Sequence, residues 1–76
     1  MSRRLPSLTP DQVIRALELG GFFVHHTTGS HRAIRHSSNP ALRVTVSRHG
    51  KALKRGTLRA IIRQAGLTRD QFLDLL

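Results

Sequence analysis

The sequence contains no cysteine, no tryptophan and no tyrosine, and only four of its 76 residues are acidic. The lack of cysteine excludes disulfides, thiolate metal sites and cysteine nucleophiles. No apolar run is long enough to cross a membrane. The basic residues near the start are not followed by the apolar stretch that a secretory signal needs. We therefore expect a cytoplasmic protein that does not bind a membrane.

Positive charge is the strongest feature of the composition. Thirteen Lys and Arg residues stand against four Asp and Glu residues, which gives a formal net charge of +9. No acidic residue lies between Val44 and Arg69. Such an excess attracts polyanions, whether nucleic acid, anionic lipid or an acidic protein, although it can also serve solubility alone.

The first predicted element is a helix over Pro10–Leu19. Thr9 can cap it, Pro10 suits the first helical position, and Gln12 completes a capping box. Two glycines at positions 20 and 21 end it.

Three strands follow, which we predict at Phe22–Thr28, His31–His36 and Leu42–Ser47. The Gly29–Ser30 pair between the first two predicts a tight turn. The third strand alternates apolar and polar residues, so the three form an antiparallel meander with one buried face.

The remaining residues predict a basic loop over Arg48–Gly56 and then two helices. Thr57 is the expected cap of the first, over residues 58–65, whose arginines lie opposite an apolar stripe. A capping box of Thr68 and Gln71 begins a short final helix that presents three apolar residues: Phe72, Leu73 and Leu76. The chain is thus an α+β protein of one domain (residues 1–76, core about 9–67). It has the order α-β-β-β-α plus a short C-terminal helix, with the helices on one face of the sheet.

The five histidines do not suggest a metal site. His25 and His26 are neighbours on a predicted strand and should point to opposite faces. No cysteine or nearby carboxylate completes a ligand set. We therefore expect neither a metal nor another cofactor.

His31 stands apart because it follows the Gly29–Ser30 turn, where backbone N–H groups can approach an anion. If Ile34 faces the core, His31 and Arg35 face solvent on the other side of the strand. An imidazole there suits proton transfer at a ribose hydroxyl or a leaving oxygen, although a lone histidine is more often only structural. Ser30 is not a candidate nucleophile, because neighbours on a strand point apart and no third group orients the imidazole.

The basic residues favour RNA bound through its phosphates. Lys51 and Lys54 lead into a helix on which Arg55 and Arg59 share one side. With only three Phe as aromatics, we expect no exposed ring to stack bases, so binding should depend on phosphates with little base readout.

Two segments of the chain resemble a known family. GGFFVHHTTGSHRAIRH (residues 20–36) and RVTVSRHGKALKRGTLRAIIRQAGLT (residues 43–68) are similar to the HicA family of mRNA-cleaving toxins from bacterial toxin–antitoxin pairs. The resemblance runs from about Gln12 to Phe72. It implies a fold like the double-stranded-RNA-binding domain, a ribonuclease with its active-site histidine at His31, and a HicB-type antitoxin that covers this site.

The sequence therefore predicts a metal-independent endoribonuclease that cleaves mRNA. His31 is the expected general acid or base, and His49 is the candidate for the second proton-transfer group. The expected RNA-binding residues are Gly29, Ser30, Arg35, Lys51, Lys54, Arg55 and Arg59. Two alternatives stay open: a non-catalytic basic RNA-binding module, and an interaction protein whose charge serves an acidic partner.

Overall fold

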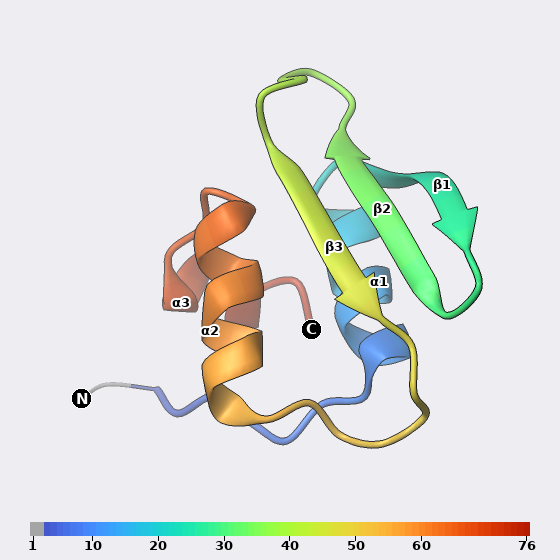
Figure 1. Ribbon diagram of the computed structural model, residues 1–76. Helices are drawn as coiled ribbons and strands as arrows, with labels where there is room; N and C mark the ends of the chain where they lie inside the picture. Colours follow the sequence, from blue (N-terminus) through green and yellow to red (C-terminus); the bar gives the residue numbers. More distant parts are fainter. Residues whose placement is uncertain (1–2) are drawn as a thin grey trace.

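The computed structural model describes residues 3–76, which form three helices around one three-stranded sheet (Figure 1). The elements are α1 (Pro10–Leu19), β1 (Phe22–Thr28), β2 (His31–His36), β3 (Arg43–Ser47), α2 (Arg55–Gln64) and α3 (Arg69–Leu73). α1 packs against β1 and β3, and α2 packs against β3. In Figure 1, α1 lies behind the sheet and α2 beside it, so the face toward the viewer carries no helix. The expected α+β layout is confirmed.

The first helix begins and ends as its sequence predicts. The Thr9 hydroxyl accepts the Gln12 N–H at 3.3 Å, and the Gln12 side chain accepts the Thr9 N–H at 2.8 Å. Such a cap stabilises a helix by about 1 kcal/mol. After the helix, Gly21 takes a φ of +94°, a left-handed conformation that glycine adopts without steric cost.

The sheet is antiparallel with the strand order β1-β2-β3. Ile34 of β2 lies opposite Val24 of β1 and Val44 of β3, and these residues face the helices. The pairing of β1 with β2 shifts by one residue between Val24 and His26, which is a β-bulge. The sheet therefore has a covered apolar face and an open polar face, with one irregularity in an outer strand.

The second helix begins earlier than predicted, so Thr57 does not cap it. The N-cap is Lys54, with no side-chain cap bond, and the Leu58 N–H already bonds to the Lys54 carbonyl at 3.0 Å. The cause lies outside the helix. Leu53 packs against the core and donates its N–H to the Leu8 carbonyl at 2.8 Å, which anchors the chain directly before the first helical turn.

The third helix has the predicted capping box, in which the Thr68 hydroxyl accepts the Gln71 N–H at 3.1 Å and the Gln71 side chain accepts the Thr68 N–H at 2.9 Å. Phe72 and Leu73 are buried, whereas Leu76 lies beyond the helix and is 53% exposed. Leu76 is therefore not part of the apolar surface that α3 contributes.

The hydrophobic core extends past residues 9–67 at both ends of the chain. Leu5 and Leu8 of the N-terminal segment are buried, as are Phe72 and Leu73 of α3. An ion pair of 2.8 Å between Arg3 and Asp74 joins the two ends. Within residues 3–76, no helix combines the length and the apolar character needed to cross a bilayer.

Candidate functional site

A two-residue turn presents His31 at one end of the sheet. Thr28 ends β1 and His31 begins β2 directly opposite it, so Gly29 and Ser30 alone make the connection. Gly29 has a φ of +55°, while Ser30 has a negative φ. This combination is typical of a type II′ turn, which requires glycine at its first position. His31 is exposed on the middle strand, and Ser47 lies opposite it on β3.

The carbonyls of the turn are bonded to the protein, but its N–H groups are not. The Ser30 carbonyl accepts the Arg48 N–H at 2.6 Å, and the Gly29 carbonyl accepts from the Arg32 guanidinium at 3.4 Å. Within residues 3–76, no protein group accepts from the N–H of Gly29 or Ser30. The turn can therefore donate two backbone hydrogen bonds to an anion beside His31.

An ion pair holds the loop between β3 and α2. The Arg48 guanidinium donates to both carboxylate oxygens of Asp11, at 2.6 and 3.2 Å. These bonds hold the pKa of Asp11 below its usual value, with a smaller contribution from the nearby charge of Arg32, and they raise the pKa of Arg48. Both ends of this pair are exposed, so its importance is geometric: it ties the loop to the start of α1.

A shallow hollow of about 290 Å³ collects the cationic loop residues next to the turn. Ser47, the β3 neighbour of His31, lies on its rim. The hollow is lined by Pro10, Ser47, His49, Lys51, Ala52, Leu53, Lys54 and Thr57. The structure thus brings three of the predicted residues, His49, Lys51 and Lys54, to the strand end where His31 lies.

His49 follows Arg48 directly and is exposed between two hollows. Besides the one above, it lines a hollow of about 350 Å³ together with Asp11 and Arg48. The Arg48 N–H donates to the Ser30 carbonyl. His49 follows Arg48 in the sequence and His31 follows Ser30, so each histidine is the chain neighbour of a residue in this hydrogen bond.

Arg35 lies away from this group. It is four residues from His31 along β2, about 13 Å at the usual rise of a strand. Its cross-strand neighbours are Phe23 and Arg43 at the opposite end of the sheet. The predicted basic surface is therefore not continuous from Arg35 to Lys51.

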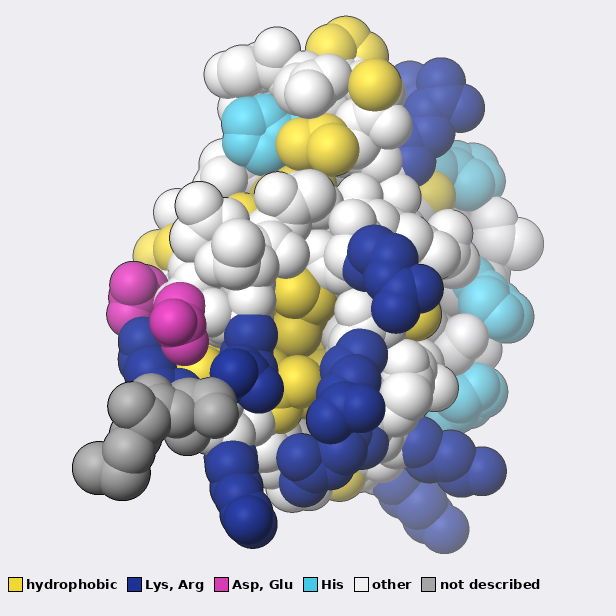
Figure 2. All heavy atoms as spheres, turned by 90° about the vertical axis from the view of Figure 1, so that its left-hand side faces the viewer, with side chains coloured by type: hydrophobic (Ala, Val, Ile, Leu, Met, Phe, Trp, Pro, Cys, Tyr) yellow, Lys and Arg dark blue, Asp and Glu magenta, His cyan; other side chains and the backbone are white. Residues whose placement is uncertain are grey.

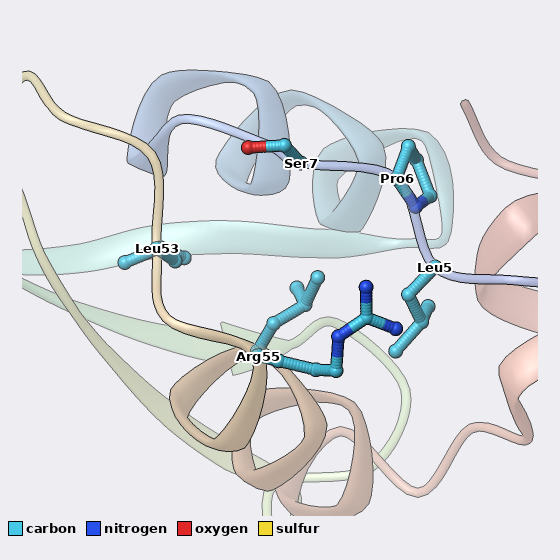
Figure 3. A pocket seen from close by; sticks show the side chains of 6 residues that line it. Leu5, Pro6, Ser7, Leu53 and Arg55 are labelled. Atoms are coloured by element: carbon cyan, nitrogen blue, oxygen red, sulfur yellow. The ribbon is translucent and has the colours of Figure 1, made fainter.

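Arg55 and Arg59 line a further hollow, of about 260 Å³, with arginines from both ends of the chain. Its lining is Arg3, Arg4, Leu5, Arg55, Arg59 and Arg69, and we call it the arginine hollow. Figure 2 shows the basic side chains over this side of the molecule, with the acidic ones at one edge. In Figure 3 the Arg55 side chain extends from α2 toward Leu5 of the N-terminal segment. Within residues 3–76, Arg4, Arg55, Arg59 and Arg69 form no ion pair.

The contribution of Arg3, Arg4 and Arg69 to this hollow was missed from the sequence. The available signal was the pair of leucines, Leu5 and Leu8, that follow the first two arginines and reach the core. Leucines in a segment of no regular structure do not reveal which helix they will cross.

Two expectations about the open face of the sheet are wrong. Phe23 is an exposed aromatic residue, with 43% of its surface accessible. The β-bulge also places His25 and His26 on the same side of β1. His26 lies opposite Ala33 of the open face, and the ring centroid of His25 lies 6.3 Å from that of the exposed Phe23. Even so, no cluster of three or more His, Cys, Asp or Glu side chains able to hold a metal ion occurs in residues 3–76.

A family model described as the HicA toxin of bacterial toxin–antitoxin systems matches residues 10–67. The matched segment runs from the start of α1 through the three strands and α2, so it contains the turn, the loop and two arginines of the hollow. No curated protein sequence matches the chain.

Proposed function

The chain belongs to the HicA toxin family of bacterial toxin–antitoxin systems, and from this we propose that it is an endoribonuclease that cleaves mRNA without a metal ion. The observation that carries the proposal is the setting of His31. An exposed imidazole follows a turn whose two N–H groups have no acceptor within residues 3–76, and two lysines, Lys51 and Lys54, line the adjoining hollow. Anion-binding donors beside a proton-transfer group are what phosphodiester cleavage requires.

The proposed reaction is an attack by a ribose 2′-oxygen on the neighbouring phosphorus. One imidazole takes the proton of the 2′-hydroxyl as the new P–O bond forms. The bond between phosphorus and the 5′-oxygen then breaks, and a second group gives that oxygen a proton. The products are a 2′,3′-cyclic phosphate and a 5′-hydroxyl, and the protons balance with no metal ion.

We assign His31 as one of the two proton-transfer groups and His49 as the other. His49 lines the hollow beside Ser47, which is the cross-strand neighbour of His31. The Asp11–Arg48 pair fixes the loop directly before His49. The N–H groups of Gly29 and Ser30 would then receive the negative charge that builds on the phosphate in the transition state.

The phosphates on either side of the cleaved bond would meet the basic residues. Lys51 and Lys54 lie in the hollow next to the turn. The start of α2 adds to them, because its N-cap is a lysine and its first turn holds no acidic residue. A helix N-terminus of this kind attracts phosphate. The arginine hollow would hold RNA further along the strand.

His31→Ala tests this proposal. Cleavage of a long RNA in the presence of EDTA should fall by about 10²- to 10⁴-fold, the usual contribution of a general acid or base. RNA affinity and thermal unfolding should change little, since the side chain is exposed. The control is Arg15→Gln at an exposed position of α1, which lies behind the sheet (Figure 1), and this variant should cut at the wild-type rate. An RNA-binding module without activity would instead bind RNA and leave it intact in both EDTA and Mg²⁺.

Membership of the family implies an antitoxin partner. We propose a HicB-type protein that is acidic where it docks and that covers His31, since a free ribonuclease would damage its own cell. Charge complementarity would speed its association with a chain of +9. Co-expression with the protein encoded next to this one, followed by hydrogen-exchange mapping, checks the arrangement. Protection should include the Gly29–Ser30 turn and cleavage should stop, and a complex that still cuts RNA contradicts the masking.

A further inference from the structure

The open face of the sheet consists of three cross-strand rows. One row is Phe23, Arg35 and Arg43, the next is His26, Ala33 and Thr45, and the last is Thr28, His31 and Ser47. Residues directly opposite one another point to the same face. The candidate catalytic residue His31 and the exposed Phe23 therefore lie on one continuous surface, which no helix of residues 3–76 covers (Figure 1).

Phe23 differs from the other two phenylalanines. Phe22 and Phe72 are 4% and 0% exposed, whereas Phe23 is 43% exposed. The ring of His25 meets that of Phe23 edge to face, at an interplanar angle of 73°. This contact limits the positions of the Phe23 ring and leaves it accessible on the open face of the sheet.

The charge around Phe23 has one sign. Arg35 lies beside it, and Arg43 lies beyond Arg35 in the same row. None of the three strands contains an acidic residue. A planar aromatic ring with arginines alongside it is suited to a single-stranded nucleic acid, whose bases stack and whose phosphates pair with guanidinium groups.

We propose that Phe23 stacks an unpaired base of the substrate RNA while Arg35 and Arg43 hold the adjoining phosphates. This inference rests on the proposed ribonuclease function and extends it to a second subsite. The Phe23 row lies about 13 Å from the His31 row along β2, a distance that an unstacked strand covers in a few nucleotides. The enzyme would therefore select RNA that is single-stranded on one side of the cleaved bond.

Kinetics with an RNA substrate form the first part of the test. Phe23→Leu keeps an apolar side chain but has no aromatic face, so KM should rise roughly 5- to 100-fold, the effect of losing one stacked base. The value of kcat should stay the same, because the contact exists in both the ground state and the transition state. Phe23→Tyr should restore KM, and thermal unfolding should show that both variants fold.

Fluorescence gives a direct reading of stacking. The chain contains no Trp or Tyr, so Phe23→Trp places the only strong fluorophore at the subsite. The probe is a 2′-O-methyl oligoadenylate of about eight nucleotides, within the usual length bound by small domains. The tryptophan emission of the Phe23→Trp variant should be quenched by this oligoadenylate and not by an abasic strand of equal length and charge. Leu19→Trp is the matched control, because Leu19 is 70% exposed but lies at the end of α1.

The outcomes separate this inference from the proposed function. Quenching of Phe23→Trp by the oligoadenylate alone supports the subsite. If anisotropy of a labelled oligoadenylate shows binding while the Trp emission is unchanged, or changes equally with the abasic strand, the subsite is wrong and the ribonuclease proposal stands. If RNA is neither bound nor cleaved, both fail. A response only to the antitoxin protein assigns this face to that partner and also overturns the inference.

Discussion

His36 shows that a histidine of this chain can be committed entirely to structure. Its Nδ1 accepts the Ser38 N–H at 3.0 Å, so the proton is on Nε2, which lies 3.2 Å from the Gly20 carbonyl that it bonds. Its ring packs edge to face against that of Phe22, with the two ring centroids 4.8 Å apart. A Cβ on Gly21 would lie only 2.9 Å from Nε2. The imidazole thus joins the end of α1 to the end of β2.

Replacing His36 by Ala should therefore destabilise the fold. The substitution removes two hydrogen bonds and an aromatic contact, and we expect the free energy of unfolding to fall by about 1–3 kcal/mol. Chemical denaturation measures this. His26→Ala, at an exposed position on β1, is the matched control and should change stability by less than about 0.5 kcal/mol. Equal stability of the two variants would show that the bonds of His36 contribute nothing.

Residue by residue, the exposure of His31 was predictable and that of Phe23 was not. Strict alternation from Ile34 places His31 on the open face, and the structure confirms it. Phe23 follows Phe22 directly, and composition alone suggested that a chain with so few aromatic residues would bury them all. The β-bulge near His25 has no glycine or proline to signal it, so the sequence had no local feature that predicted the break in alternation.

Among the elements, the loop between β3 and α2 depends most on one long-range contact. Asp11 and Arg48 are far apart in sequence, and their ion pair fixes the loop that carries His49 and Lys51. Because the pKa of Asp11 is lowered in the folded protein, the ion pair stabilises the fold at pH values above the ordinary Asp pKa. That contribution is lost as the pH falls through the lowered value.

Asp11→Asn should accordingly be less stable than the wild type at pH 7. The difference in stability between the two proteins should shrink as the pH falls below the ordinary Asp range and vanish once the wild-type carboxyl is protonated. Thermal unfolding of both proteins across this pH range measures the difference. Glu18→Gln removes the same charge from an exposed residue of α1 without an ion pair in residues 3–76, so it should show no such dependence. A constant difference at all pH values would contradict the assignment.

The starts of α1 and α3 could be predicted from sequence because local capping boxes define them. The start of α2 could not, since it depends on the bond between Leu53 and Leu8, two residues from distant parts of the chain. Thr57 is a good capping residue, but it lies inside α2, because the bond of Leu53 to Leu8 fixes the start of the helix at Lys54. At α2 the local capping signal was overridden by the packing of the N-terminal segment against the loop.

At the scale of the molecule, the basic residues behind the charge of +9 lie in separate regions rather than along one path, and one of these regions is Arg35 and Arg43 on the open face of the sheet. Lys51 and Lys54 lie at the end of the sheet near His31, and the arginine hollow lies against α2 and α3. This division explains why the charge pattern of the sequence predicted RNA binding but did not predict the path of the RNA over the surface. The arginines of the hollow come from positions 3 to 69, and only the folded chain brings them together.

The salt dependence of RNA binding should reveal the hollow. Each phosphate contact on single-stranded RNA contributes a log–log slope of about −0.7. Arg69→Gln should therefore flatten the slope by about 0.7 for a long RNA, and leave it unchanged for a short oligonucleotide that reaches only the His31 site. Arg15→Gln on α1 is the control of equal charge and should leave both slopes as they are. An unaltered slope for Arg69→Gln with long RNA would place the strand elsewhere.

The β-bulge in β1 also bears on how this protein behaves at high concentration. β1 is an outer strand of the sheet, and a regular outer strand exposes a row of backbone groups to which another chain can add in an amyloid-like manner. The shifted pairing between Val24 and His26 bends that row and interrupts its spacing. The irregular edge therefore discourages one copy of the chain from pairing its β1 with the sheet of another copy when the protein is concentrated.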